Sequence, residues 1–570
     1  MVHLKPSEHV RIACLAADRM RRSAISRVLY SPPLRWRFGA ASADQLLIVL
    51  QDLRTADPSF WDEVELGQFG LAGTVAVVDD LSPFDIAPPN EAWARALHGF
   101  EWLRHMNAAG RPEARVAARR LAVEWAVRHH GGSGIAWEPA VTARRLISWL
   151  SHSAFLLEGA DTRTFDTITE SLAQQLVRLS ASWRNSPGGY QRLLALTALV
   201  LADLSIADHE QHLKETEAAF AAELARQILA DGGHVSRNPG VLVDLMLDLL
   251  PLHQCFAARA RAASPVLTST MQRILSMLKF MRMGDVMLAR FNGMSVASPA
   301  GLATVLAYDD KPGTRLAGAS ETRYVRLERA AAVLIMDAGP PPPLEAAGEA
   351  HAGCLSFEFS AGTRLIFVNG GAPGAAHGDW RAASRATASH NTLCLGEKSS
   401  SKLIRHAMLA EIVGSHPIRY PDRVAARVEE HGGSLEVAAH HNGYVRRFGL
   451  FHRRTLALNA TGRRLLGIDR LDSARNARFR RDIPFSIHFH LHPDVTCRRG
   501  QGGTAAEIVL AGGEVWYFTL EGAQLAIEES TYFADSAGPR SALQIVARGA
   551  TSGETEVRWI VEAGTGLAGP

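Results

Sequence analysis

Cysteine is scarce in this chain of 570 residues, and the five cysteines are widely separated: Cys14, Cys255, Cys354, Cys394 and Cys497. No CxxC pair occurs, so the sequence predicts neither a disulfide framework nor a structural zinc cluster. Only six of the 61 basic residues are lysine. The formal net charge is just +3, so the chain as a whole lacks the basic excess of a nucleic-acid-binding protein.

Long apolar runs are also missing. The run nearest the N-terminus, residues 12–17, stops at Asp18 and is too short for the core of a signal peptide. The best apolar segment, residues 193–207, contains Asp203 and is typical of a buried helix rather than a membrane span. We therefore expect a cytoplasmic protein with no membrane partner. Walker A, HExxH and GxSxG motifs do not occur either.

The spacing of apolar residues changes once along the chain. From about residue 90 to 285 apolar residues recur at helical spacing, and short connections carry Gly, Pro or Asp. Such short links favour antiparallel helix pairs. The helices are predicted over 91–109, 113–130, 139–157, 163–184, 191–207, 210–230, 239–261 and 265–283. Residues 1–89 are mixed, with an opening helix near 8–30 and an extended, proline-containing entry.

From about residue 286 the pattern has period two, with frequent glycine turns. Strands are predicted over 331–336, 354–359, 364–368, 435–439, 485–492 and 515–520. Many short strands and few helices favour an antiparallel β-sandwich. The predicted organisation is therefore an N-terminal entry segment (1–89), a helical domain (90–285) and a β-sandwich domain (286–570).

Four motifs carry a resemblance to a known family. They read His351-Ala-Gly-Cys-Leu-Ser-Phe-Glu, Val368-Asn-Gly-Gly, Arg385-Ala-Thr-Ala-Ser-His-Asn-Thr-Leu and, in the helical half, Asp231-Gly-Gly-His. In this order and on these halves, they resemble the heparinase II/III-like family. The resemblance implies an incomplete α/α toroid of antiparallel helix pairs followed by a C-terminal antiparallel β-sandwich. Characterised members are polysaccharide lyases that cleave uronate-containing glycans by β-elimination.

That reaction requires particular groups. A proton leaves the carbon next to a uronate carboxylate, so the charge of the carboxylate must be neutralised by Arg, Asn or a protonated His. A base, usually Tyr or His, must reach that proton, and an acid must reach the leaving glycosidic oxygen. We expect these groups in a cleft between the two halves.

The resemblance points to three candidate catalytic residues. His390 matches the sandwich histidine that family members use near the cleft, although a histidine that orders a loop is an alternative. His234 follows Asp231-Gly-Gly, close to a helix start. Tyr190 stands near the family's Asn-His position and could serve as acid or base, or simply anchor packing. The chain lacks that Asn-His pair, and residues 240–242 provide no Tyr where the family has its catalytic one.

Five further residues are predicted to contact substrate: Arg237, Asn238, Arg385, Asn391 and His351. Arg385 could hold a uronate carboxylate with its planar guanidinium, or could form a salt bridge instead. Asn238 precedes Pro239, a pattern that is also typical of a helix N-cap.

The sequence predicts no cofactor. A divalent metal in the β-sandwich is an alternative that the residues do not support. Some family members bind a structural zinc in the sandwich, where a His precedes an Asp by two residues. Here Gly353 follows His351 at that spacing, and Asn369 stands where a later Asp would be. His488, His490 and His492 alternate along a predicted strand, but no third ligand is identified, so we interpret them as part of a partly wet sheet face.

The predicted function is a lyase that cleaves an acidic, uronate-containing polysaccharide or oligosaccharide by β-elimination. The alternative is a catalytically silent glycan-binding or assembly protein on the same scaffold, which the missing Tyr and Asn-His favour. Hydrolysis by a carboxylate pair has thin support, since nothing places Glu358 and Asp337 together. The expected partner is an acidic glycan and not nucleic acid, and the expected state is a monomer or homodimer.

Overall fold

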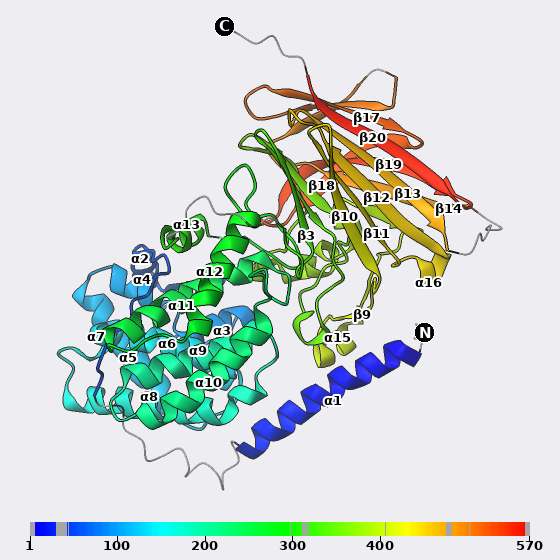
Figure 1. Cartoon of the computed structure of the whole chain (residues 1–570). Coiled ribbons are helices and arrows are strands. Elements are labelled where there is room, and N and C mark those ends of the chain that lie inside the picture. Colours follow the sequence, from blue (N-terminus) through cyan, green and yellow to red (C-terminus); the bar gives the residue numbers. More distant parts are fainter. Residues whose placement is uncertain are drawn as a thin grey trace.

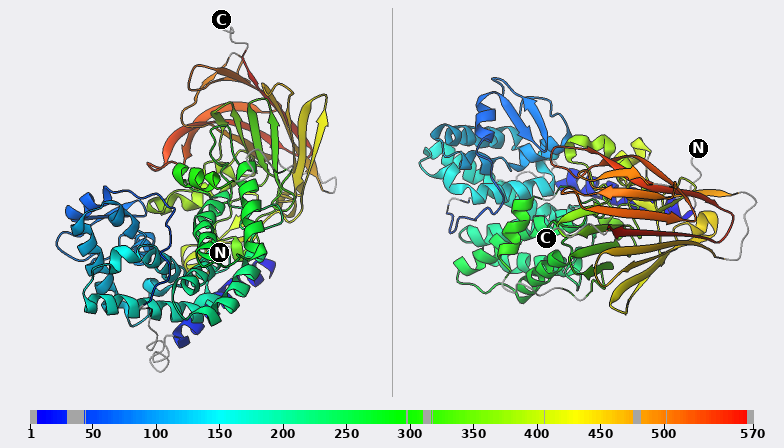
Figure 2. Two further views of the ribbon diagram at one scale, coloured as in Figure 1. Left: turned by 60° about the vertical axis from the view of Figure 1, so that its left-hand side comes forward. Right: turned by 90° about the horizontal axis from the view of Figure 1, so that it is seen from above.

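The computed structural model describes residues 6–29, 43, 45–296, 298–309, 316, 318–404, 406–474, 482–500 and 502–564. Helices make up the first half of the chain and strands the second, as the sequence predicts (Figure 1). The helices follow an open arc, and the strands form a separate layered body beside it (Figure 2). The predicted fold class, an incomplete α/α toroid followed by an antiparallel β-sandwich, is confirmed.

Many helices of the N-terminal half begin at a polar capping residue or at a proline. Its helices are α1 (Pro6–Leu29), α2 (Phe60–Glu65), α3 (Glu91–Gly99), α4 (Leu103–Ala108), α5 (Pro112–His129), α6 (Pro139–Ser151), α7 (Ser153–Leu157), α8 (Thr162–Ser182), α9 (Tyr190–Ser205), α10 (Glu210–Gln227), α11 (Pro239–Ala258), α12 (Pro265–Phe280) and α13 (Pro299–Ala307). A hairpin of β1 (Gln68–Leu71) and β2 (Thr74–Val77) precedes α3. The side chains of Asn90, Asp161 and Ser264 accept hydrogen bonds from the first turns of α3, α8 and α12.

Two predicted helices are interrupted. Phe100 adopts a left-handed conformation (φ 56°) that ends α3, so the helix expected over 91–109 becomes α3 and α4. The helix expected over 139–157 likewise divides at His152 into α6 and α7. Apolar periodicity continues across both breaks, which is why the sequence pattern does not reveal them.

Helix α9 is the centre of the helical core. Residues 193–205 are all buried, and α9 packs against α6, α10 and α11. Among the described residues one helix, α11, is long and apolar enough to cross a membrane. However, 67% of its most apolar window is buried within the protein, as expected for a core helix.

The strands form antiparallel sheets. They are β3 (Tyr324–Arg329), β4 (Ala332–Asp337), β5 (Phe357–Ala361), β6 (Arg364–Phe367), β7 (Leu393–Leu395), β8 (Lys402–Leu403), β9 (Pro417–Arg419), β10 (Val424–His431), β11 (Ser434–His441), β12 (Leu450–Leu458), β13 (Arg464–Ser473), β14 (Ile483–His490), β15 (Thr496–Arg499), β16 (Ala505–Val509), β17 (Val515–Glu521), β18 (Gln524–Tyr532), β19 (Arg540–Thr551) and β20 (Thr555–Ala563). One sheet has the order β10-β11-β12-β13-β20-β17-β16-β15, and the four-stranded sheets are β18-β19-β14-β7 and β3-β4-β5-β6. Between them, the ring of Trp559 stacks on Phe357 and Phe518 in a fully buried core.

Contacts between the two halves include those of residues 231–238 of the helical part with residues 321–340 at the start of the sandwich. Asp231 Oδ2 accepts hydrogen bonds from the Thr322 N–H and hydroxyl at 2.7 and 2.8 Å. Helix α13 lies beyond residue 285 yet packs on α11 of the helical part. The division into units at residues 89 and 285 stays a prediction.

Candidate functional site

Two of the predicted site residues, His351 and His390, are in direct contact inside the sandwich. His351 Nδ1 lies 3.0 Å from His390 Nε2, and both residues are buried. His390 Nδ1 lies 2.7 Å from the carbonyl oxygen of Ala386, which can only accept a hydrogen bond. His390 therefore carries its proton on Nδ1, and its Nε2 accepts from His351. Burial lowers the pKa of His390 to about 4 and holds that of His351 well below its ordinary value, so both rings are neutral at pH 7.

Arg385 lies beside this histidine pair and is 2% exposed. Its Nε donates to the carbonyl oxygen of Ala350 at 2.9 Å, whereas its buried Nη2 has no hydrogen-bond partner among the described residues. Burial, together with the nearby charge of Arg381, lowers the pKa of Arg385 to about 9. No described carboxylate forms a salt bridge with it, so an anion would relieve an unfavourable buried charge.

Asn391 is fully buried and holds backbone together. Its Nδ2 donates to the carbonyl oxygen of Phe357 at 2.8 Å, and its Oδ1 accepts from the His490 N–H at 2.6 Å. Its own N–H donates to Asn369 Oδ1 at 3.2 Å. These three hydrogen bonds join the segment around Asn391 to β14, to the start of β5 and to Asn369. The predicted contact of Asn391 with substrate stays a prediction.

His234 uses both ring nitrogens in local hydrogen bonds. Its Nδ1 accepts from the Ser236 N–H at 3.1 Å, so Nε2 carries the proton and donates to Gln227 Oε1 at 2.9 Å. Gln227 Nε2 in turn donates to the carbonyl oxygen of Gly189, directly before Tyr190. Burial lowers the pKa of His234 to about 4. The histidine therefore connects the 231–238 segment to the start of α9.

Arg237 and Asn238 also have structural partners. Arg237 Nη2 lies 2.5 Å from Asp337 Oδ1 on β4, and Nε and Nη1 donate to the carbonyl oxygens of Thr322 and Pro340. Asn238 is the N-cap of α11, with Oδ1 accepting from a backbone N–H of the first turn at 2.9 Å. The N-cap alternative for Asn238 is thus confirmed, while its contact with substrate remains a prediction. Arg237 links the two halves of the chain.

Tyr190 begins α9 and belongs to a charged network inside the toroid. Its hydroxyl donates to Asp248 Oδ2 at 3.0 Å and accepts from Arg144 Nη2 at 2.8 Å. Arg144 and Arg54 both pair with Asp248, with 2.8 Å between nitrogen and oxygen in each case. Burial and the charge of Asp248 raise the pKa of Tyr190. The phenol is therefore a proton donor rather than a base at neutral pH.

Asp244 is the exposed member of this network. It lies one helical turn before Asp248 on α11, and its backbone carbonyl accepts from Arg54 Nη2 at 3.3 Å. Although the side chain reaches solvent, the surrounding protein removes part of its hydration and raises its pKa to about 6. The pKa of Asp248 is lowered instead, because Arg144 and Arg54 more than offset its burial. The two carboxyl groups thus differ in protonation near pH 6.

Sequence reasoning missed this network apart from Tyr190. Its other members are Arg54, Arg144, Asp244 and Asp248. The available signal was the pair of aspartates four residues apart within the otherwise apolar stretch 241–252, since ionisable groups in such a helix need partners. The arginines come from distant segments and carried no local signal.

The structure brings some predicted residues together and leaves others apart. His351, His390 and Arg385 are neighbours, and Gln227 links His234 to the start of α9. No described hydrogen bond, ion pair or ring contact joins the histidine pair to His234 or Tyr190. The predicted catalytic roles of His390, His234 and Tyr190 stay predictions.

The zinc that the resemblance implies for some members does not fit the residues at this place. His351 and His390 direct a nitrogen each at the other, and the Asn369 amide oxygen accepts from a backbone N–H. Cys354 turns its thiol toward the carbonyl oxygen of Gly339. Among the described residues no group of three His, Cys, Asp or Glu could hold a metal ion.

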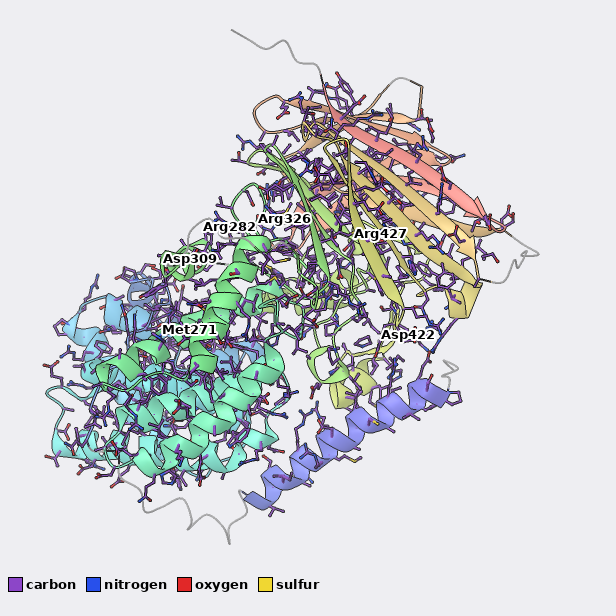
Figure 3. All side chains as sticks on the ribbon, viewed as in Figure 1. Met271, Arg282, Asp309, Arg326, Asp422 and Arg427 are labelled. Atoms are coloured by element: carbon purple, nitrogen blue, oxygen red, sulfur yellow. The ribbon has the colours of Figure 1, made fainter. Side chains whose placement is uncertain are left out.

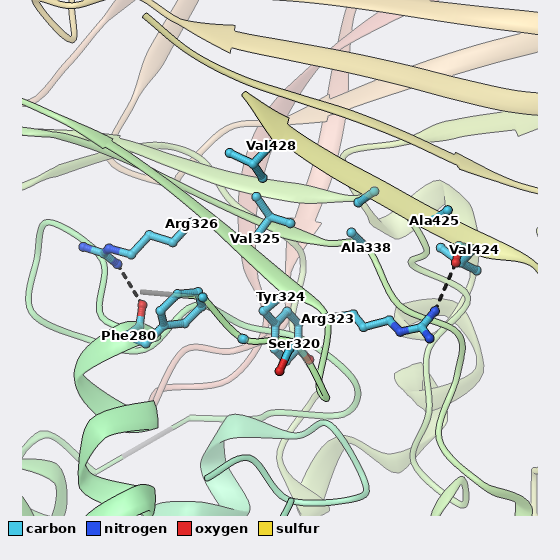
Figure 4. Close-up of a pocket in the computed structure, with 13 residues that line it drawn as sticks. Phe280, Ser320, Arg323, Tyr324, Val325, Arg326, Ala338, Val424, Ala425 and Val428 are labelled. Carbon is cyan, nitrogen blue, oxygen red and sulfur yellow. Dashed lines mark hydrogen bonds between the residues drawn. The ribbon is translucent and has the colours of Figure 1, made fainter. Parts of the chain in front are cut away.

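A pocket of about 670 Å³ lies between the end of α12 and strands β3 and β10. Figure 3 shows Arg326 of β3 near the end of α12, with Arg427 of β10 farther into the sandwich. In Figure 4, Arg326 donates to the carbonyl oxygen of Phe280 and Arg323 to that of Val424. None of the predicted site residues lines this pocket.

The sandwich half of the chain matches a known protein family. Residues 311–560 match the family model of the heparinase II/III-like C-terminal domain. The sandwich half is thus similar to the heparinase II/III-like C-terminal domain. The fold of the chain is similar to that of heparinase III, with a TM-score of 0.69 at 12% identity over 94% of this chain and 91% of that one. It is also similar to a mutant heparan sulfate lyase from Pedobacter heparinus, with a TM-score of 0.59 at 16% identity over 99% and 90% of the two chains.

A curated relative covers both halves. FtsZ-localized protein C of Caulobacter vibrioides is 29% identical over 542 residues, which is 93% of this chain and 92% of that protein. The likeness to the lyases, at 12–16% identity, extends to the fold alone. The heparinase II/III-like scaffold is therefore shared with proteins whose names imply different roles.

Proposed function

We propose that this protein is a non-catalytic assembly protein on the heparinase II/III-like scaffold and that it associates with FtsZ. The observation that carries the proposal is the state of the predicted acid–base groups. His234 and His390 are 2% and 1% exposed, and each ring nitrogen of both residues has a hydrogen-bond partner inside the protein. A proton-transfer group needs an open path to substrate, which these two residues lack.

The comparison with the curated relative supports the same proposal. Its 29% identity extends over nearly the whole of both chains, so helical and sandwich parts are shared together. The name of that relative refers to localisation with FtsZ and not to a reaction. Fold does not determine function, and the relative therefore provides a better guide than the more distant lyases. The proposed place of action is the cytoplasm.

The test is direct binding between purified full-length protein and purified FtsZ of the same organism, with fluorescent fusions of both proteins in cells. We expect saturable binding and a shared location. The same protein is screened for thermal stabilisation by acidic oligosaccharides, because the glycan-binding form of this proposal predicts a shift there. If FtsZ does not bind and the fusion is dispersed in the cell, association with FtsZ is wrong.

A second candidate is the uronate lyase, favoured by one specific observation. Arg385 presents a buried guanidinium nitrogen without a partner among the described residues, next to two neutral histidines. In this mechanism Arg385 neutralises a uronate carboxylate, and a neutral histidine removes the proton from the adjacent carbon. The bond to the leaving glycosidic oxygen breaks as the double bond forms, and the protonated Tyr190 gives its proton to that oxygen. The substrate would be an acidic oligosaccharide.

An absorbance assay separates the two candidates. The protein is incubated with a panel of uronate oligosaccharides, and the ultraviolet absorbance of the unsaturated product is followed for wild type, His390→Ala, Arg385→Ala and Tyr190→Phe. His431→Ala is the matched control because His431 is exposed on the sandwich surface. The assembly proposal expects no product from any variant. Product that the wild type and the control release, and that His390→Ala loses, would establish the lyase.

A further inference from the structure

Residues 350–352 and 385–391 lie against each other in the sandwich and are joined by backbone hydrogen bonds. The Ala352 N–H donates to the carbonyl oxygen of Arg385 at 2.9 Å, and the Thr387 hydroxyl donates to that of Ala352 at 2.6 Å. The hydrogen bond between His351 and His390 crosses the same boundary. We infer that His351 and His390 form a metal-free clasp that fastens these two segments, at the place where a structural zinc would otherwise hold them.

The orientation of the two histidine rings leaves no shared site for a metal ion. A metal ion would need a lone pair from each histidine. Here the His351 Nδ1 proton and the His390 Nε2 lone pair are used against each other, and the His390 Nδ1 proton is held by the carbonyl oxygen of Ala386. His390 could bind a metal only by giving up one of these two bonds, because its Nε2 lone pair and its Nδ1 proton are both engaged. The clasp and a metal ion held by both rings therefore exclude each other.

Gly353 leaves the space that the His390 ring occupies. A Cβ atom built at residue 353 would lie 2.7 Å from His390 Cδ2, closer than real Cβ contacts allow, and 3.1 Å from Nε2, which is also tight. The His390 ring thus fills the space that a longer side chain at residue 353 would occupy. Glycine is needed here for close approach, since no positive φ is recorded at this residue. The absence of a side chain at residue 353 lets the two rings meet.

The remaining potential ligands are committed elsewhere. Asn369 contributes an amide rather than a carboxylate, with Oδ1 accepting from the Asn391 N–H and Nδ2 donating to the carbonyl oxygen of Arg290. The Cys354 thiol points to the carbonyl oxygen of Gly339, and burial raises the pKa of the thiol well above its ordinary value. Neither residue provides the negative charge that a zinc ion with only two neutral histidines would require.

The first test needs no variant. Full-length protein, freed of any affinity tag, is purified from cells grown with added zinc, and its metal content is measured by mass spectrometry. Thermal unfolding is then followed with zinc chloride and with EDTA. We expect far less than one zinc per chain and the same midpoint in both solutions. One zinc per chain that is lost from His351→Ala, together with a lower midpoint in EDTA, would overturn the inference.

Variants test the clasp itself. Gly353→Ala is expected to lower the unfolding midpoint equally with and without zinc, whereas Gly131→Ala, with open space around residue 131, serves as the matched control. His351→Ala and His390→Ala are compared singly and together, because partners in one hydrogen bond lose less stability together than the sum of the separate losses. Strictly additive losses would contradict the clasp. These experiments measure stability and metal content, so their outcome does not depend on whether the protein binds FtsZ or cleaves a glycan.

Discussion

Arg237 of the helical part and Asp337 of β4 form a buried ion pair at 2.5 Å, with side-chain exposures of 6% and 5%. Arg237 adopts a left-handed backbone conformation (φ 56°) to reach across, and it also donates to two carbonyl oxygens of the sandwich half. Asp337 Oδ2 accepts in addition from Asn292 at 3.3 Å. A segment that the sequence associates with substrate thus forms one of the connections between the two halves of the molecule.

Removal of Arg237 is expected to destabilise the protein strongly. Arg237→Ala leaves Asp337 buried without its partner, which costs about 3–5 kcal/mol for buried pairs. The loss is measured as a lower urea midpoint and as faster proteolysis between the two halves. Arg111→Ala is the control, because Arg111 forms exposed ion pairs with Asp62 and Glu65, worth about 0–1 kcal/mol. Equal losses in the two variants would show that the pair does not hold the halves together.

Gly233→Ala is expected to disrupt the neighbouring contact. A Cβ at residue 233 would lie 2.1 Å from Thr322 Cγ2, and Thr322 is held by Asp231 through its N–H and hydroxyl. Overpacking of this kind costs about 1–3 kcal/mol. The thermal unfolding midpoint of Gly233→Ala is compared with that of Gly131→Ala, where open space surrounds the added methyl group. A Gly233→Ala protein with the wild-type unfolding midpoint would mean that the contact between residues 233 and 322 accommodates the methyl group without loss of stability.

Stability is expected to fall as the pH drops from about 6.5 toward 4. Burial lowers the pKa of His234 and of His390 to about 4, and of His490 to about 3, below the ordinary histidine value of about 6.5. The unfolded chain therefore binds more protons in this range, and the stabilisation is complete only above about pH 6.5. Each such histidine contributes on the order of 1–3 kcal/mol.

Urea midpoints between pH 4.5 and 8 check this prediction. His234→Gln keeps a polar side chain but no longer titrates, so its pH dependence should be shallower than that of wild type. His431→Gln, at an exposed position, should leave the slope unchanged. Asp244 acts in the opposite direction with a pKa of about 6, but its exposure to solvent reduces the effect. A midpoint that does not change with pH would contradict the assignment of neutral, buried histidines.

Asp248→Asn and Tyr190→Phe should differ in their effect on stability. Asp248→Asn removes the carboxylate that pairs with both Arg54 and Arg144, whose side-chain exposures are 14% and 12%, and is expected to cost about 3–5 kcal/mol. Tyr190→Phe removes one hydrogen-bonded hydroxyl and is expected to cost about 1–2 kcal/mol. Thermal and urea unfolding of the two variants measure the difference. The opposite order of the two losses would mean that the phenol, and not the carboxylate, organises the network.

The local features of this protein follow from its sequence. Helical spacing predicts α5, α8, α10 and α12, and the polar cap with proline at Asn238 predicts where α11 begins. The period-two pattern of apolar residues predicts β4, β11 and β14. The motifs around residues 351 and 390 predict the family, and residues 311–560 match the model of its C-terminal domain. These signals are local, because caps and periodicity act within one or two turns of a helix or one strand.

The pairing of polar side chains was decided by the tertiary structure alone. Tyr190 meets Asp248 across 58 residues, Arg237 meets Asp337 across 100, and His351 meets His390 across 39. No spacing rule specifies such partners, because each contact depends on how distant helices and strands are packed together. The sequence by itself determined the order of helices and strands and the residue types available for chemistry. The folded chain determined that His234, His390 and Arg237 use their polar groups inside the protein, since buried polar atoms must find partners.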